Sequence, residues 1–326
     1  MDKDIAAPKT LQEAILYFSN PDTCLAFMVE QRWPDGRVLC PTCGSNRVTF
    51  LAAYRRWKCA SKHPRQQFSI KVGTIFEDSP LGLEKWLPAL WMLVNDKNGI
   101  SSYEVHRALK VTQKTAWFML HRLRLALQVG RFVKFSGKVE ADETFIGPHP
   151  RNMHADKRER LTGSRREDER YISKAIVAGL LDRAKGKVYA QVVPTVRAEH
   201  LAPIISKRVK PGSEMITDML RSYWSVRDRY IHSVIDKTKS YVKGHVHTNG
   251  LENFWSLLKR GLRGTYISVD SFHLHRYVDE QVFRYNERRD PHGDSGRFVK
   301  ALRRIVGKRL TYRDLTTDPG LATTPA

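Results

Sequence analysis

Hydrophobic positions along this chain follow two different periods. Between residues 83 and 130, the apolar residues of WLPALWML and AWFMLHRLRLAL recur every three or four positions, which predicts helices. From about residue 137 the pattern changes to short runs rich in Val, Ile and Ala, which predict strands: KVEADETFIG, SKAIVAGLLD, KVYAQVVPT and EMITD. Helical patterns return at 250–263 and 270–288. We therefore expect a helical region followed by a mixed α/β domain.

Polar and turn-rich stretches separate these regions. Residues 10–31 predict a helix, or a helix pair broken near Pro21, and residues 36–75 combine turns with short β runs such as RVTFLA and QFSIKVG. A highly charged stretch at 148–170 is expected to be a mobile loop, and TTDPGLATTPA a disordered tail. The expected division is an N-terminal helical segment at 1–35, a small ribbon at 36–75, a helical domain at 76–132, the α/β domain at 133–290, and a basic helix with the tail at 291–326.

The charge balance points to a polyanionic partner. The 326 residues include 56 Lys and Arg against 34 Asp and Glu, a formal charge of +22. Neutralising phosphates releases condensed counterions, so this excess favours a nucleic acid over the alternatives of a merely basic surface or a ribosomal-type protein. No run approaches the ~18 apolar residues of a membrane helix, and the opening residues do not resemble a signal peptide. We expect no membrane contact and a soluble cytoplasmic protein, associated in a bacterium with the nucleoid.

Three of the four cysteines have the spacing of a metal knuckle. Cys40 and Cys43 form C-x2-C, and Cys59 and His63 form C-x3-H. Zinc prefers four such ligands in a tetrahedron, and four protein ligands leave no open position, so we expect a structural zinc ion. The alternative is a chance C-x2-C with Cys59 as a core thiol, and Cys24 is interpreted as a core residue.

Residues 98–127 predict a helix-turn-helix. Ser101 and Glu104 form a capping box for the first helix, and Thr112 can cap the second after a short turn. We expect the exposed face of the second helix to contact DNA through four side chains: Gln113, Lys114, Arg122 and Arg124. The alternative is an ordinary helix pair packed on the core.

Three acids fall where a strand, a second strand and a helix could bring them together. Asp142 lies in KVEADETFIG, Asp218 ends EMITD, and Glu252 begins the helix GLENFWSLLKRGL. Three carboxylates suffice to hold two Mg2+ or Mn2+ ions, and their mutual repulsion requires such cations. Lys259, seven residues after Glu252 on the same helix face, could hold a DNA phosphate. Taken singly, each acid could instead serve a turn, a cap or a solvated face.

Several blocks together resemble a known family. They are CPTCGS, KVGTIFEDSPLGLEKWL, ISSYEVHRALKVTQKTAWFMLHRLR, VEADETFIG, ITDMLRSYW, HTNGLENFWSLLKRGLRGTY and HLHRYVDEQVFRYNER. In order and number they resemble the bacterial insertion-sequence transposases, in which a zinc ribbon and a helix-turn-helix precede a DDE catalytic domain. The resemblance implies an α/β, ribonuclease-H-like (DDE integrase-type) fold with acids on the first strand, the fourth strand and a later helix.

The resemblance also implies roles for individual residues. It makes Asp142, Asp218 and Glu252 the three metal-binding acids. Within such groups Asn or His can replace the third acid, so Asn249, one helical turn before Glu252, could assist it or replace it. Glu140 and Glu143 flank Asp142, and we expect both to point to the opposite face of the strand.

The activity implied is cutting and joining of DNA. The enzyme would bind the inverted ends of its own element, hydrolyse a phosphodiester bond, and transfer the freed 3′-hydroxyl to target DNA, as a homodimer or larger assembly. Lys259, Arg260 and Arg263 would contact DNA, and Trp255 and Tyr266 could stack on splayed bases. Two alternatives are a zinc-ribbon regulator or inactive transposase copy, and another nuclease of the same fold.

Overall fold

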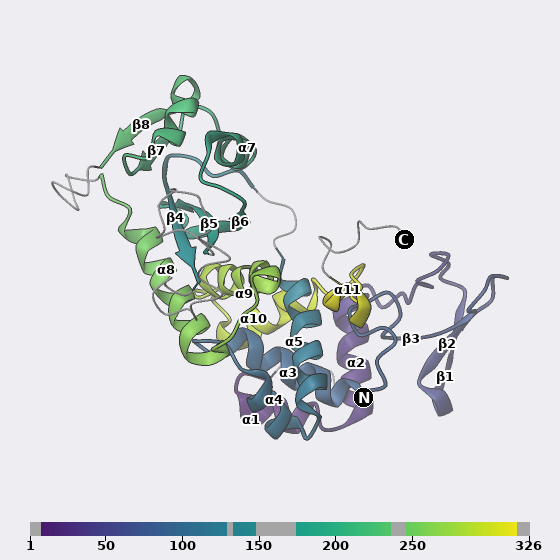
Figure 1. Ribbon diagram of the computed structural model, residues 1–326. Coiled ribbons are helices and arrows are strands. Elements are labelled where there is room, and N and C mark those ends of the chain that lie inside the picture. Colours follow the sequence, from purple (N-terminus) through teal and green to yellow (C-terminus); the bar gives the residue numbers. More distant parts are fainter. Residues whose placement is uncertain (1–7, 129–132, 148–173, 236–245, 318–326) are drawn as a thin grey trace, which may run out of the picture. The chain divides into compact units, whose positions relative to one another are not determined.

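The computed structural model describes residues 8–128, 133–147, 174–235 and 246–317 (Figure 1). The chain forms two compact units, one of residues 1–128 with 287–326 and one of residues 129–286. The charged stretch at 148–170 and almost all of the expected tail lie outside the described residues. No described helix is both long enough and apolar enough to cross a bilayer.

The first unit is built mainly of helices. Its helices are α1 (Leu11–Tyr17), α2 (Pro21–Arg32), α3 (Leu83–Asn95), α4 (Ser102–Leu109), α5 (Gln113–Leu127), α10 (Gly293–Leu302) and α11 (Tyr312–Thr316). The predicted break near Pro21 is confirmed, because Asn20 caps α2 and Pro21 occupies its first turn. Phe298 of α10 packs against the rings of Phe18 and Trp91, with centroid distances of 5.5 and 5.1 Å. Helix α10, from the C-terminal part of the chain, thus contributes to the core of the first unit.

A small antiparallel sheet and a capped helix pair occupy the rest of this unit. The sheet has the order β1 (Val48–Leu51), β2 (Arg56–Cys59) and β3 (Gln67–Ser69). Both halves of the predicted capping box are present at the start of α4. Thr112 accepts a hydrogen bond from the Thr115 amide and caps α5. The two predicted β runs and the capped helix pair are therefore confirmed, whereas the central strand β2 was not predicted from the sequence.

The second unit contains a five-stranded mixed sheet. Its order is β6-β5-β4-β7-β8, formed by β4 (Lys138–Ile146), β5 (Ala175–Asp182), β6 (Lys187–Val193), β7 (Glu214–Thr217) and β8 (Ile231–Val234). Strand β4 runs antiparallel to β5 and parallel to β7, and β8 continues the parallel part. This order, with Asp142 on the first strand and Asp218 after the fourth, confirms the ribonuclease-H-like α/β fold. Strand β8 was not predicted from the sequence.

Helices cover both faces of this sheet. On one face, α7 (Ala198–Arg208) and the 3-10 segment η3 (Arg221–Arg229) pack over Val139, Ala141 and Leu180. On the other, α8 (Asn249–Arg260) and α9 (Leu274–Asn286) pack over Val177, Leu181 and Val188 (Figure 1). A π-helical turn, η4 (Gly261–Tyr266), and a short 3-10 turn, η5 (Ser271–His273), join α8 to α9. The buried stripe predicted for α8 is confirmed, since Leu251, Trp255, Leu258 and Leu262 are all buried.

The Trp255 side chain of α8 packs closely against the sheet at Gly179. This residue lies on β5 directly opposite Asp142 of β4. A Cβ atom at Gly179 would lie 2.6 Å from Cζ2 of Trp255, closer than packed atoms can come. The missing side chain therefore makes room for the indole ring.

Gly179→Ala should destabilise the second unit. The added methyl group must displace Trp255, and overpacking of this kind costs about 1–3 kcal/mol of unfolding free energy. Denaturant unfolding would measure the loss. Gly264→Ala is the matched control, because a Cβ there meets no atom within 4 Å; equal stability losses in the two variants would contradict this account of the packing.

Candidate functional site

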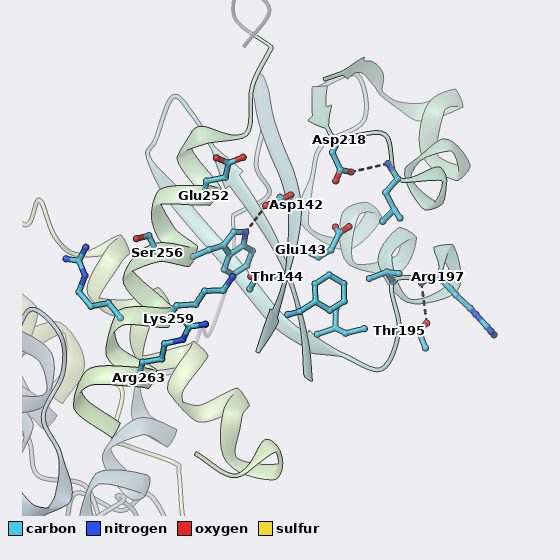
Figure 2. A pocket seen from close by; sticks show the side chains of 16 residues that line it. Asp142, Glu143, Thr144, Thr195, Arg197, Asp218, Glu252, Ser256, Lys259 and Arg263 are labelled. Carbon is cyan, nitrogen blue, oxygen red and sulfur yellow. Dashed lines mark hydrogen bonds between the residues drawn. The ribbon is translucent and has the colours of Figure 1, made fainter. Parts of the chain in front are cut away.

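The predicted acids line one cleft in the second unit. The cleft has a volume of about 1080 Å³ and receives Asp142 from β4, Asp218 from the end of β7, and Glu252 from the first turn of α8 (Figure 2). Three predicted cations, Lys259, Arg260 and Arg263, line the same cleft. Segments more than 100 residues apart in the sequence thus contribute both signs of charge to one surface.

Each acid is held by a neighbouring group. Trp255 donates its indole N–H to Oδ2 of Asp142 at 2.9 Å, and Asp142 is only 6% exposed. Asp218 accepts the Leu220 amide at 3.1 Å, and the Thr248 hydroxyl donates to Oε1 of Glu252 at 3.2 Å. Each acid therefore has a hydrogen bond that orients its carboxylate.

The donor set of the cleft fits hard divalent cations. All three groups are carboxylates, the ligands that Mg2+ and Mn2+ prefer. The oxygens of the three acids do not all lie within 4.8 Å of one another. Among the described residues, the group of potential metal ligands that does meet this distance consists of three cysteines and one histidine in the first unit. Like charges repel, so bringing these oxygens closer requires positive charge between them.

Two cations of the cleft, Lys259 and Arg260, lie on the helix that carries Glu252, and Arg263 lies on the π-helical turn that continues it. Burial lowers the pKa of Lys259, and repulsion from Arg263 lowers it further, while Asp142 acts in the opposite direction. Lys259 is therefore a partly desolvated cation whose charged form is disfavoured by Arg263 and favoured by Asp142. An incoming phosphate would favour its charged form.

The expectation that Glu140 and Glu143 both face away from Asp142 is wrong. Side chains alternate along a strand, so Glu140, two residues before Asp142, lies on the same face, and both acids contact α8. Glu143 does turn to the opposite face, where Tyr223 donates to it at 2.7 Å, yet it still lines the cleft. Burial, and then the charge of Glu143, raise the pKa of Tyr223, which keeps this donor protonated.

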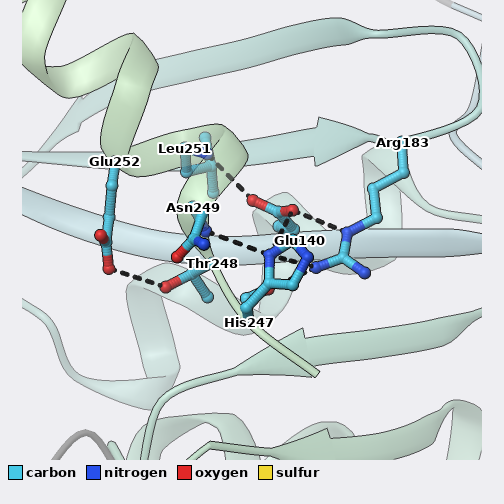
Figure 3. Close-up of polar contacts among 7 residues, drawn as sticks. All are labelled: Glu140, Arg183, His247, Thr248, Asn249, Leu251 and Glu252. Atoms are coloured by element: carbon cyan, nitrogen blue, oxygen red, sulfur yellow. Dashed lines mark hydrogen bonds and ion pairs between the residues drawn. The ribbon is translucent and has the colours of Figure 1, made fainter. Parts of the chain in front are cut away.

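Glu140 connects α8 to the first strand of the sheet. Its carboxylate is 1% exposed and accepts the Leu251 amide at 2.9 Å and Nε of Arg183 at 2.7 Å. Arg183 also reaches Nδ1 and the carbonyl of His247, just before the helix (Figure 3). We call Glu140, Arg183 and His247 the helix anchor. It fixes the N-terminus of α8 one residue from Glu252.

Asn249 belongs to the surroundings of this anchor. Its amide is 3.4 Å from Nδ1 of His247, and it is absent from the residues that line the cleft (Figure 3). Glu252, by contrast, faces the cleft (Figure 2). Of these two residues, the cleft lining therefore includes Glu252 and not Asn249.

The four predicted zinc ligands form a compact cluster in the first unit. The ligand atoms of Cys40, Cys43, Cys59 and His63 all lie within 4.8 Å of one another. Cys43 Sγ and Cys59 Sγ are 3.7 Å apart, and Cys40 Sγ and His63 Nε2 are 3.4 Å apart. A tetrahedron with Zn–S bonds of about 2.3 Å has edges of roughly 3.8 Å, so this donor set fits a structural zinc ion.

The protonation of this cluster suits a metal. Burial raises the pKa of the Cys59 thiol, but hydrogen bonds from His63 and the Ser61 backbone outweigh it and lower the pKa to about 6. The hydrogen bond between His63 and the Pro64 carbonyl, and then the one with Cys59, raise the pKa of His63 to about 9. Cys59 is thus readily a thiolate, and a bound cation would displace the proton of His63.

The helix-turn-helix prediction needs a correction at two arginines. Lys114 is exposed near the start of α5, as expected, whereas Gln113, also expected to be exposed, is half-buried. Arg122 and Arg124, expected on an exposed face, are 4% and 1% exposed. Arg122 donates to the Glu77 carbonyl at 2.6 Å and lies over the Trp86 ring. Most side chains in the second half of α5 are buried, so Arg122 and Arg124 lie within the protein and not on an exposed face of the helix.

The helix anchor and the Trp255–Asp142 bond were missed from the sequence. Strand alternation alone places Glu140 beside Asp142, so that signal was present. Nothing in the pattern indicates that Arg183 or His247 reaches Glu140, because those contacts depend on the sheet register.

A ribonuclease-H-like sheet with an acid-lined cleft, in a chain that also carries a knuckle of three cysteines and one histidine, is the arrangement of the DDE-type transposases.

Comparison with known proteins agrees with this class. Residues 134–286 match the model of the ISXO2-like transposase domain, and residues 19–61 match that of the transposase zinc-ribbon domain. A Haemophilus influenzae protein described as an uncharacterized transposase-like protein is 38% identical over 104 residues, which cover 31% of this chain and 83% of that protein. The chain therefore belongs to the zinc-ribbon family of insertion-sequence transposases.

A second relative comes from Halobacterium salinarum. It is described as an uncharacterized protein in transposable element ISH50 and is 27% identical over 243 residues, covering 72% of this chain and 81% of that protein. Among solved structures, the Mos1 strand transfer complex matches with 15% identity, a TM-score of 0.23, and coverage of 64% of this chain and 78% of that one.

Replacing a zinc ligand should remove the metal. We expect about one zinc per chain in the purified protein and in Cys24→Ala, which changes a buried cysteine outside the cluster, but not in Cys59→Ser. His63→Cys should retain zinc, because it completes a set of four cysteine ligands. Elemental analysis gives the content; a zinc-free wild type, or equal loss in Cys24→Ala, would contradict the assignment.

Glu140→Gln should loosen the start of α8. The amide keeps the shape but loses the charge that holds Arg183 and the Leu251 amide, a loss of about 1–3 kcal/mol for a buried charge-assisted bond. Hydrogen exchange of the Leu251 amide should accelerate. Glu199→Gln, at an exposed glutamate of α7, should leave it unchanged. Unchanged protection in Glu140→Gln would show that the anchor does not hold the helix.

Proposed function

We propose that this protein is the transposase that cuts and joins DNA at the ends of its own insertion sequence. The observation that carries the proposal is that Asp142, Asp218 and Glu252 line one cleft. Two divalent cations, Mg2+ or Mn2+, held by these acids would activate the attacking oxygen and stabilise the leaving oxygen. The family membership supports the same reaction class.

The residues of the cleft have distinct parts in this proposal. Hydrogen bonds from Trp255, Leu220 and Thr248 orient the three acids before DNA arrives. Lys259 and Arg263 lie along the same cleft and would hold the phosphates beside the scissile bond. When DNA binds, its phosphates would offset the repulsion between Lys259 and Arg263 and attract both cations.

The first unit would supply recognition of the element ends. Gln113 and Lys114 stand at the start of α5, the part of a recognition helix that reaches base edges. Gln113 donates to the Ser102 hydroxyl at 2.9 Å, which orients its amide, and Lys114 lies 4.9 Å from the Tyr312 ring centre. With Arg122 and Arg124 buried, these two side chains are the proposed contacts of this helix. A cut at two ends calls for a dimer or larger assembly on DNA.

Replacing any of the three acids should abolish cutting but not binding. Asp142→Asn, Asp218→Asn and Glu252→Gln keep the size of each side chain and remove its charge. Because a metal contributes several kcal/mol and every 1.36 kcal/mol is tenfold in rate, cleavage should fall about 100-fold or more. The assay measures cutting and joining of DNA that carries the element ends, with Mg2+ or Mn2+, and binding by gel shift.

Asp228→Asn, at an exposed acid of the same unit, is the control and should cut normally. A wild-type protein that binds the ends but cuts with neither metal would favour a regulator or an inactive copy. Cutting without joining would favour another nuclease. Activity retained only in Glu252→Gln would reassign the third acid, with Asn249 tested next.

A further inference from the structure

A second cavity continues from the acid-lined cleft. It has a volume of about 370 Å³ and lies between the end of β4 and the segment that follows α8. Lys259 and Arg263 line both cavities. A DNA strand held by these two cations in the cleft would therefore have the second cavity beside it.

The walls of the second cavity differ from those of the first. They are formed mainly by apolar side chains, Phe145, Ile146, Leu262, Ile267 and Val269, together with Ser268. None of the described residues that line it is acidic, and its cations are the two shared with the cleft. Such a site suits a flat ring whose faces pack against apolar side chains and which is joined to a phosphate, with the Ser268 hydroxyl available to one polar edge of the ring. Within DNA, that description fits a nucleobase.

Ile267 is presented at this cavity by a strained turn. Its φ and ψ are 61° and −59°, and the Ser268 amide donates to the Tyr266 carbonyl at 2.6 Å, which makes a γ-turn with positive φ. This turn is rare and costly, above all for a β-branched residue. Strain of this kind persists where the surrounding structure imposes it, often at ligand sites.

The neighbouring residues hold the turn, whereas Ile267 projects from it. The Tyr266 ring packs 4.7 Å from that of Tyr277, and its hydroxyl donates to Glu280. The π-helical turn Gly261–Tyr266 leads directly into Ile267, and π-turns recur at functional sites. Ile267 itself is 80% exposed. Tyr266, expected from the sequence to stack on DNA, is instead the support, and the exposed apolar group is the next residue.

We propose that the second cavity binds one nucleobase unstacked from DNA beside the scissile phosphate, and that Ile267 enters the stack in its place. Apolar wedges such as Ile partly unstack base steps in minor-groove DNA-bending proteins, and a base extruded from the stack needs a pocket of its own. The inference rests on the proposed function, because it places DNA in the acid-lined cleft. Lys259 and Arg263 would hold the phosphates on either side of the displaced nucleotide.

Fluorescence of 2-aminopurine tests this directly. The probe is a duplex of the element end with 2-aminopurine at each position next to the scissile phosphate, mixed with full-length protein before Mg2+ is added. Unstacking should raise the fluorescence several-fold at one position. Ile267→Gly should abolish the rise and slow cleavage about tenfold, the scale of one lost base-stacking contact. DNA affinity should change little, because the cost of unstacking disappears together with the contact.

Ile267→Gly also guards against a folding artefact. Glycine adopts a φ near +61° without strain, so the variant should melt no lower than the wild type. Ile231→Ala, at an isoleucine of the same unit that is 65% exposed, should keep both the fluorescence rise and the cleavage rate.

The outcomes separate the two proposals. Wild-type protein that binds and cuts the ends without any rise in fluorescence would overturn the base site and leave the proposed function intact. A rise that survives in Ile267→Gly would overturn the wedge. Slower cleavage in Ile267→Gly with an unchanged rise, and with loss of dimer in solution, would assign Ile267 to a contact between copies. Protein that neither binds nor cuts would overturn both proposals.

Discussion

The site depends on how closely α8 can lie against the sheet. Gly179 removes the one side chain that would keep the Trp255 indole away from β5. The indole then reaches Asp142 on the neighbouring strand, while Glu140, on the same face, bonds to the Leu251 amide. One strand thus contributes an acid that holds the helix and an acid that lines the cleft. The position of Glu252 therefore depends on the bond between Glu140 and the Leu251 amide as much as on the fold.

The two acids on this strand differ in what surrounds them. Glu140 is fully enclosed and has Arg183 as a charged partner, so its charge is compensated within the protein. Asp142 opens onto a cleft whose cations, Lys259 and Arg263, stand among those that would meet DNA. A buried, paired carboxylate is suited to positioning, whereas one in an open cleft is suited to binding cations and substrate. The charged partner and the opening to the cleft, more than burial or residue type, distinguish their parts.

The sequence was sufficient where chemistry is local. The capping box at Ser101 and the Cys40–Cys43 knuckle depend on neighbours within a few residues, and the helix periods show the buried stripe of α8 directly. It was insufficient where partners are distant. Arg122 was expected in solvent because nothing nearby shows that Glu77 and Trp86 cover it. The strained turn at Ile267 likewise depends on contacts of Tyr266 with α9.

The first unit shows the same limit on a larger scale. Its aromatic core joins Phe18 and Trp91 to Phe298, so the ends of the described chain close one core while the α/β unit is formed by the residues between them. Closing a longer loop costs only slightly more entropy than closing a short one, so such an insertion is tolerated thermodynamically. The core is nevertheless incomplete until α10 has been made. The helices that we propose for DNA recognition therefore gain their full packing only in a chain that already contains the α/β unit.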